Sequence, residues 1–386
     1  MTVMRFSLVQ LVAAVIVLSA CAGDATLSPG SEWLRSEPEA QGMDSRVLDV
    51  LDREFASGKY GYVDGMMIFR HGSLVYERHY QHDYDAPFHG YDQTRGPYNY
   101  YDPDWHPWYE RGPLHSMQSV SKSVTSALIG VALQRGELAG VDIRVMPFFA
   151  EFASDNRDPL WGEITLRDLL TMTSGIEWDE SSVPYVDLKN MCAAMEQSDD
   201  WIQFVLAQSM RESPGASFEY NSGVTMMLAH ILVQATGKPL ADYAEEHLFR
   251  PLGIDQYYWK ETPTGLHDAE GGLYLEPGDL ARFGELYASD GVINGTRILP
   301  VNWVQESMEP ATRVPDGDGR YGYQWWLLPY AGGTKSWAYS ADGYGGQFLL
   351  IVPEYDLIAV FTGWNIYGEP TLDSAVALQR VLEAMR

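Results

Sequence analysis

Ser119 and Lys122 stand three residues apart, a spacing at which a hydroxyl and an amine could work together. They open an apolar run that predicts a helix over residues 119–135, and side chains three positions apart share one face of a helix. The amine could then hydrogen-bond to the hydroxyl, and the positive end of the helix dipole would favour an oxyanion nearby. The pair is a candidate serine nucleophile with its basic partner, although an S-x-x-K spacing also arises by chance.

Tyr220 is the second candidate catalytic residue. It ends a turn directly before an apolar segment that predicts a helix over residues 222–236. A nearby ammonium favours phenolate over the reference tyrosine pKa of ~10, so Tyr220 beside Lys122 could act as general base on Ser119. The chain has 24 tyrosines, so the alternative is an ordinary packed aromatic side chain.

Glycines mark a third segment, residues 339–347, which reads Y-S-A-D-G-Y-G-G-Q. We expect a glycine-rich turn that leads into a strand. Glycine lets a backbone N–H approach a substrate and point at its carbonyl oxygen, as an oxyanion hole requires. Taken alone, the segment is equally typical of a structural turn.

Metal binding is another possible source of chemistry. Six of the nine histidines lie between residues 71 and 115, in a segment where Asp83, Asp85, Asp102 and Asp104 could add carboxylate ligands. His79 and His82 could bind one ion together only from a helix, whereas the residues before them predict a strand. Residues 316–319 lack the glutamate that closes a calcium loop. We therefore predict no metal and no cofactor. The sequence also lacks the G-x-S-x-G motif of the α/β-hydrolases.

Apolar periodicity predicts the elements that position these residues. Expected helices lie near residues 44–56, 119–135, 165–172, 199–208, 222–236, 239–248 and 371–385. Expected strands lie near residues 63–70, 74–80, 321–328, 347–352 and 357–362. Residues 83–113 are expected to form a long loop. Strands at both ends predict one α/β lobe from residues 33–118 and 271–386, with a mostly helical lobe from residues 119–270 inserted into it. We expect the substrate cleft at the seam.

The composition excludes several classes of protein. With 386 residues, of which 46% are hydrophobic, the chain is globular rather than disordered. Its 53 acidic and 26 basic residues give a net charge of −27, which argues against nucleic acid as a partner because phosphate recognition needs clustered lysine and arginine. Two cysteines cannot make a disulfide framework. An enzyme is the leading class that remains.

Residues 1–20 resemble a bacterial export signal. Arg5 precedes an apolar run that is too short to span a bilayer comfortably, and Leu18-Ser19-Ala20-Cys21 resembles the lipobox of lipoproteins. That resemblance implies cleavage before Cys21, a diacylglycerol anchor on its sulfur that attaches the protein to a membrane, and a location in the bacterial cell envelope. Residues 21–32 would then be a tether. The alternative is an ordinary secretory signal.

The three segments together resemble the serine β-lactamase and penicillin-binding-protein superfamily, on the branch of class C enzymes, carboxylesterases and 6-aminohexanoate-dimer hydrolases. The resemblance extends from about Trp33 to the C-terminal helix, with further matches at residues 63–68, 169–176, 271–274 and 279–283. It implies an α+β fold of the β-lactamase type, with a mainly antiparallel sheet flanked by helices and an inserted, mostly helical lobe.

The resemblance also implies roles for individual residues. Ser119 would be the acylated nucleophile, Lys122 its partner and Tyr220 the tyrosine of the Y-x-N motif. The N–H groups of Ser119 and Tyr344 would form the oxyanion hole. Substrate contacts would come from the second and third segments and from the loop after Ser174-Gly175: Asn221, Ser222, Ala341, Asp342, Gly343, Trp178, Glu180 and Tyr185.

Two departures from the superfamily pattern bear on the substrate. Residues 220–222 read Y-N-S, with the amide one position early, so Ser222 is an alternative to Asn221 for positioning a substrate amide. Residues 341–343 read A-D-G where the superfamily has lysine-threonine-glycine, and that lysine holds the carboxylate of β-lactams and D-alanyl-D-alanine peptides. We therefore expect a serine hydrolase that cleaves a small ester or linear amide through an acyl-enzyme. The alternatives are a D-alanyl-D-alanine peptidase or β-lactamase, and a non-catalytic envelope protein of the same fold.

Overall fold

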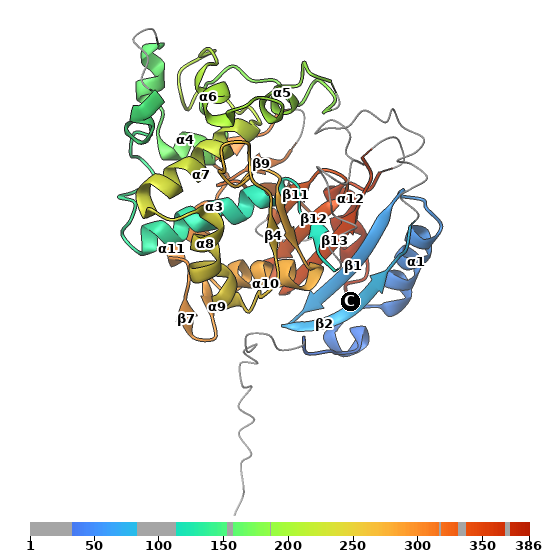
Figure 1. Ribbon diagram of the computed structural model, residues 1–386. Helices are drawn as coiled ribbons and strands as arrows, with labels where there is room; N and C mark the ends of the chain where they lie inside the picture. The colour runs from blue at the N-terminus through green and yellow to red at the C-terminus, as the bar shows by residue number, and fades with distance from the viewer. Residues whose placement is uncertain are drawn as a thin grey trace, which may run out of the picture.

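The computed structural model describes residues 33–82, 113–152, 157–185, 187–315, 318–330, 337–366 and 371–386 (Figure 1). Several sequence predictions fall outside these residues. They are the export signal, Cys21, the tether, most of the long loop with the four aspartates named as candidate ligands, and the first half of the calcium-like turn at residues 316–319.

An eight-stranded antiparallel sheet forms the centre of the fold, in the order β2-β1-β13-β12-β11-β10-β9-β8 (Figure 1). Its strands are β1 (Val63–Arg70), β2 (Ser73–His79), β8 (Thr312–Arg313), β9 (Arg320–Tyr321), β10 (Trp326–Pro329), β11 (Trp337–Gly343), β12 (Gln347–Val352) and β13 (Leu357–Gly363). Because β1 pairs with β13, the N-terminal hairpin and the C-terminal strands share one sheet.

Helices cover both faces of this sheet: α1 (Ser45–Ala56) and α12 (Ser374–Leu382) on one, α3 (Val120–Gln134) and α10 (Pro277–Ala288) on the other. Alternate residues of a strand point to opposite faces. Met66 and Ile68 therefore join the core beneath α1 and α12, while Met67 and Phe69 join the core beneath α3 and α10. A strand buried on both faces needs apolar residues throughout, which explains the continuous apolar run in β1.

Shorter elements complete the fold. The helices are α4 (Leu166–Leu170), α5 (Met191–Glu196), α6 (Trp201–Leu206), α7 (Ser222–Thr236), α8 (Leu240–Ala244), α9 (Arg250–Leu252) and α11 (Val301–Ser307). A π-helical turn, Glu245–Phe249, joins α8 to α9, and 3₁₀ turns lie at Pro38–Gln41, Met146–Phe152, Pro159–Glu163 and Pro353–Tyr355. The strands β3 (His115–Ser116), β5 (Leu273–Leu275) and β4 (Tyr258–Trp259) form a small sheet, and β6 (Val292–Ile293) pairs with β7 (Thr296–Arg297).

The structure confirms the predicted α+β fold, and the helices expected at 44–56, 119–135 and 222–236 are present within one residue. Two local predictions were wrong. The strand expected over residues 321–328 is split into β9 and β10, because Gln324 adopts a φ of +63° and interrupts the extended chain. The third segment was expected to be a turn before a strand, but its first half belongs to β11 itself. The helices α5, α10 and α11 were not predicted.

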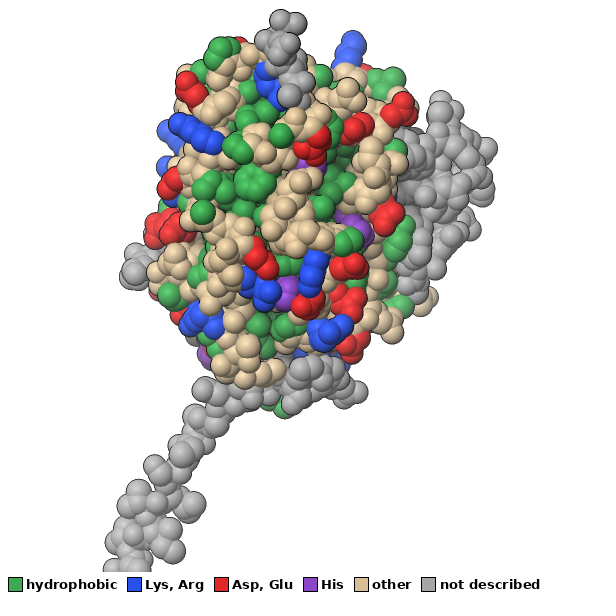
Figure 2. Space-filling view, turned by 60° about the vertical axis from the view of Figure 1, so that its left-hand side comes forward, with side chains coloured by type: hydrophobic (Ala, Val, Ile, Leu, Met, Phe, Trp, Pro, Cys, Tyr) green, Lys and Arg blue, Asp and Glu red, His purple; other side chains and the backbone are tan. Residues whose placement is uncertain are grey.

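Charged side chains of both signs are mixed on the face shown in Figure 2, where lysine and arginine lie beside aspartate and glutamate rather than in a continuous basic patch. Opposite charges also form ion pairs on the protein surface, for example Arg250–Glu245 (2.7 Å) and Arg135–Glu137 (3.0 Å). Within the described residues, none of the helices combines the length and the apolar character needed to cross a membrane.

Candidate active site

Ser119 stands where the chain enters the buried helix α3. It occupies the N-cap position and follows Gln118, whose φ of +47° lies in the left-handed region that non-glycine residues seldom adopt. Most of α3 is buried, whereas Ser119 is partly exposed. A hydroxyl in this place could attack an external carbonyl, and the helix N-terminus would stabilise the oxyanion that forms.

Hydroxyl groups on the first turns of α3 fix the helix to its neighbours. Ser123 Oγ donates a hydrogen bond to the carbonyl oxygen of Gln324 (2.6 Å), and Thr125 Oγ1 donates to that of Ala269 (3.1 Å). Ser126 Oγ donates to the carbonyl oxygen of Tyr323 (2.8 Å). Buried polar groups need such partners, and here the partners hold the serine-bearing helix in one place and one rotation.

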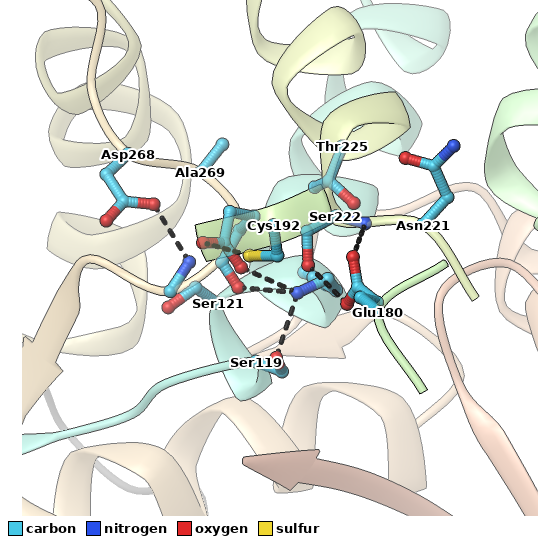
Figure 3. A network of polar contacts seen from close by, with 12 residues as sticks. Ser119, Ser121, Glu180, Cys192, Asn221, Ser222, Thr225, Asp268 and Ala269 are labelled. Carbon is cyan, nitrogen blue, oxygen red and sulfur yellow. Dashed lines mark hydrogen bonds and ion pairs between the residues drawn. The ribbon is translucent and has the colours of Figure 1, made fainter. Parts of the chain in front are cut away.

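Lys122 is buried, with 1% of its surface exposed, and its ammonium group has three acceptors. Nζ donates to Ser119 Oγ (2.8 Å), to the backbone oxygen of Glu270 (2.9 Å) and to Glu270 Oε2 (2.9 Å), as Figure 3 shows for this network. An ammonium has three N–H donors, so this set satisfies it completely. The structure thus brings together the two residues that the S-x-x-K spacing singled out.

Glu270 is a site residue that the sequence prediction missed. It lies just before β5, is 4% exposed, and forms a buried ion pair with Lys122. Burial alone would lower the pKa of Lys122, but the charge of Glu270, with smaller contributions from Tyr220 and Glu180, raises it well above its ordinary value. Burial would raise the pKa of Glu270, yet the Lys122 charge lowers it. Both groups are therefore ionised at neutral pH.

Tyr220 lies over the same lysine. Nζ of Lys122 is 5.2 Å from the centre of the Tyr220 ring, and that ring stacks on Trp326 with centroids 5.5 Å apart. Burial raises the pKa of Tyr220 to about 12, although the Lys122 charge and hydrogen bonding to Ser119 act in the opposite direction. Tyr220 is therefore a phenol at rest, held beside the positive charge that would stabilise its phenolate.

Glu180, expected to contact substrate, instead anchors the start of α7. Its carboxylate accepts hydrogen bonds from the backbone N–H and the hydroxyl of Ser222 (both 2.8 Å), from Trp178 Nε1 (2.6 Å) and from the Tyr185 hydroxyl (3.1 Å). It is 1% exposed, and burial raises its pKa. This carboxylate at a helix N-terminus fixes the position of Tyr220, two residues before Ser222.

Three more of the expected substrate contacts are buried. Asn221 caps α7 by accepting a hydrogen bond from the N–H of Val224 (3.1 Å) and is 1% exposed. Ser222 is 1% exposed and Trp178 2% exposed, and both are bonded to Glu180. In this conformation the three side chains are turned into the protein, and their contact with a substrate stays a prediction. Their polar atoms are used in holding α7, which the sequence pattern alone could not distinguish.

Neighbouring side chains of the third segment, residues 339–347, point to opposite faces of the sheet. Asp342 accepts hydrogen bonds from Ser340 and from Ser374 Oγ of α12 (2.6 Å), so its side chain points away from α3, and its contact with a substrate stays a prediction. Burial raises the pKa of Asp342 to about 6. Ala341, its neighbour, is 1% exposed and packs in the core that contains α3.

The turn after β11 carries the predicted second oxyanion donor. Tyr344 is 37% exposed, its hydroxyl donates to the backbone oxygen of Ile366 (2.9 Å), and its ring lies 5.1 Å from that of Tyr185. Gly343 precedes it, and a Cβ at that position would be 2.3 Å from the Met117 carbonyl oxygen. The turn is therefore held against the residues that lead into Ser119, as an oxyanion hole built from both segments requires.

Cys192, Glu196 and Glu270 place a sulfur and two oxygens within 4.8 Å of one another, a spacing that could hold a metal ion. Glu270 is already paired with Lys122, and the Cys192 thiol donates to its second oxygen (3.6 Å). Burial raises the pKa of Cys192 and of Glu196 well above their ordinary values, so both are neutral. In this arrangement Glu270 is the ion-pair partner of Lys122, and the three side chains form a hydrogen-bonded group beside that pair.

Comparisons with known proteins agree with this geometry. A family model described as Beta-lactamase matches residues 60–369. The 6-aminohexanoate-dimer hydrolase of Paenarthrobacter ureafaciens is 26% identical over 64% of this chain and 65% of its own. The D-alanyl-D-alanine-carboxypeptidase/endopeptidase AmpH of Escherichia coli strain K12 is 25% identical over 44% of this chain and 48% of its own. The matched stretches thus span about half to two thirds of these relatives.

The fold is also shared with solved structures. A family VIII carboxylesterase superposes with a TM-score of 0.62 and 17% sequence identity, covering 92% of this chain and 98% of the other. At this identity the likeness concerns the fold, and it extends over nearly the whole of both chains.

Proposed function

The chain belongs to the beta-lactamase family, and on that premise we propose that it is a serine hydrolase that cleaves an ester or a linear amide through an acyl-enzyme on Ser119. The observation that carries the proposal is the 2.8 Å hydrogen bond from Lys122 Nζ to a partly exposed Ser119 Oγ. A structural lysine would not need a solvent-accessible serine as its partner. The 6-aminohexanoate-dimer hydrolase relative supports a hydrolase of this kind.

The acylation step follows from the positions of three residues. Tyr220, as phenolate, takes the proton from Ser119 Oγ while that oxygen forms a bond to the substrate carbonyl carbon. The carbonyl π electrons move to its oxygen, which the N–H groups of Ser119 and Tyr344 stabilise. When the tetrahedral intermediate collapses, the leaving group departs with the proton returned by Tyr220. Water then repeats the sequence on the acyl-enzyme and releases the acid.

The third segment favours esters and linear amides over β-lactams. Ala341 stands where a lysine would hold the substrate carboxylate, and the next side chain, Asp342, points to the opposite face. Neither side chain can supply a positive charge to an anionic substrate. The AmpH relative is named as a D-alanyl-D-alanine carboxypeptidase, so that activity is the second candidate.

A fluorophosphonate probe tests the proposal, because it reacts with an activated serine whatever the natural substrate is. We expect the wild type to be labelled and Ser119→Ala to remain unlabelled. Absence of Ser119-dependent labelling would leave the non-catalytic binding protein as the better description. Hydrolysis of nitrocefin as fast as that of a short p-nitrophenyl ester would favour the β-lactamase or peptidase reading instead.

We also propose that the enzyme acts in the bacterial cell envelope, held there by a lipid on Cys21. The support is the order Leu18-Ser19-Ala20-Cys21 after an apolar run. An enzyme at this location would encounter its substrate outside the cytoplasm.

A further inference from the structure

Glu270 makes two contacts with Lys122 that have different consequences. The backbone oxygen of residue 270 accepts one hydrogen bond (2.9 Å), and any amino acid at this position could provide it. The carboxylate accepts another at the same distance and adds a full negative charge inside the protein. Burying a carboxylate is costly unless it is paired, so its presence calls for a function that the backbone oxygen does not serve.

We propose that Glu270 is the positioning residue that holds Lys122 as an ammonium ion against Ser119, so that Tyr220 is the group that accepts the serine proton. The inference rests on the proposed function, since it assigns the protons of that same site. A purely structural Glu270 would only hold the fold together. In the role proposed here, the charge of Glu270 decides whether Lys122 or Tyr220 loses its proton first.

Among the acidic groups near Lys122, Glu270 has the largest effect on the lysine pKa. The neighbouring Glu196 is neutral because burial raises its pKa well above the ordinary value. Glu180 has its oxygens engaged by Ser222, Trp178 and Tyr185. The titratable groups that interact directly with Lys122 or Tyr220 are Glu270, Glu180, Cys192, Asp268 and Tyr321. Glu196 and Lys260 lie one step farther out, where Glu196 interacts with Glu270 and Lys260 with Glu196 and Asp268.

Distance decides which proton leaves first. Glu270 Oε2 lies 2.9 Å from Lys122 Nζ and makes the largest charge contribution to the pKa of Lys122, whereas it contributes less to the pKa of Tyr220 than Lys122 and Glu180 do. A charge stabilises a nearby proton more strongly than a distant one, so the carboxylate retains the lysine proton more firmly than the tyrosine proton. When the Lys122–Tyr220 pair loses one proton, the remaining state is ammonium and phenolate. The phenolate then takes the proton from Ser119 Oγ as that oxygen bonds to carbon.

The test measures the rate of fluorophosphonate labelling of Ser119 as a function of pH. In the wild type the rate rises with pH as the Lys122–Tyr220 pair loses its proton. Glu270→Gln keeps the shape of the side chain and a hydrogen-bond acceptor but removes the negative charge. The loss of this charge lowers the pKa of both Lys122 and Tyr220. We expect the midpoint of the rise to move to lower pH by about one unit or more. Glu270→Asp keeps the charge one methylene farther away, so its midpoint should lie between the two.

Glu285→Gln is the matched control. Glu285 is a largely buried carboxyl on α10, whose surroundings include Arg282 and Asp356 and not the Lys122–Tyr220 pair. The same substitution there should leave the midpoint unchanged. Glu270 profiles that superimpose on the wild type, or folded Glu270→Gln that is unlabelled at every pH, would overturn the inference.

The outcomes separate this inference from the proposed function. If the wild type shows no Ser119-dependent labelling, the proposed function fails. If labelling depends on Ser119 but not on the charge at residue 270, the role of Glu270 alone fails. Should Glu270→Gln not fold, as judged by circular dichroism, the midpoint of Glu270→Asp decides: an unshifted profile overturns the inference.

Discussion

Gly343 and Met117 are in direct backbone contact across the site. A Cβ on Gly343, at the end of β11, would lie 2.3 Å from the carbonyl oxygen of Met117, two residues before Ser119. Glycine lets the strand come this close, and the contact sets the separation between the nucleophile and the turn that carries Tyr344. The proposed oxyanion hole therefore requires a residue without a side chain at position 343.

Gly343→Ala should therefore separate β11 from the residues before Ser119. We expect a loss of about 1–3 kcal/mol in the free energy of unfolding, as for other overpacked sites, and at least a tenfold slower labelling of Ser119. Urea unfolding and probe kinetics measure the two effects. Gly162→Ala, where nothing lies within 4 Å of the added Cβ, is the control that should show neither.

Replacing Lys122 should lower both stability and activity, and a second substitution at Glu270 should restore only stability. Lys122→Met removes the partner of Ser119 and leaves Glu270 without a countercharge. We expect labelling to slow by about 10²–10⁴-fold and stability to fall by about 3–5 kcal/mol. The double variant Lys122→Met/Glu270→Gln should regain part of the stability and none of the activity. A double variant no more stable than the single one would contradict the ion pair described here.

Tyr220→Phe should remove the pH dependence of labelling. Tyr220 has a pKa of about 12 because of burial, so its phenolate fraction, and with it the labelling rate, rises with pH. Without the hydroxyl we expect a rate lower by about 10²-fold or more and nearly flat with pH. Tyr321→Phe, on a buried neighbour whose ring lies 6.5 Å from that of Tyr220, should keep the wild-type profile. Equal losses in both variants would point to packing instead.

Asp342→Asn should change stability without changing catalysis. Burial raises the pKa of Asp342 from 3.8 to about 6, so the folded state binds a proton that the unfolded state has already lost. Its contribution is fully present below pH 4 and is lost as the pH rises through 6. Between pH 4 and 7, unfolding free energy should fall by about 2 kcal/mol more in the wild type than in the variant. A large loss of labelling would instead support the prediction that Asp342 contacts the substrate.

Cys21→Ser tests the proposed anchor. If Cys21 carries a diacylglycerol, the native protein should partition into the detergent phase of a Triton X-114 extract and the variant into the aqueous phase. Mass spectrometry of the mature N-terminus reports the same change directly. Variants at Ser119 should partition like the wild type, and an unmodified, water-soluble native protein would favour an ordinary secretory signal.

The sequence by itself determined what is local. Ser119 and Lys122 meet because one turn of helix places them on the same face, and the apolar runs at residues 63–70 and 347–352 form strands because both of their faces are covered. Tyr220 directly precedes the helix that the apolar run over residues 222–236 predicts. Each of these follows from neighbours a few positions apart.

Only the tertiary structure decided which distant groups share the site. Glu270 pairs with Lys122 across 148 positions of sequence, and no periodicity links a carboxylate before one strand to a lysine on a distant helix. Had residues 337–343 been recognised as a strand, alternation would have placed Ala341 and Asp342 on opposite faces. The charge state of Lys122 is thus fixed by packing: burial makes a counterion necessary, and the fold supplies Glu270.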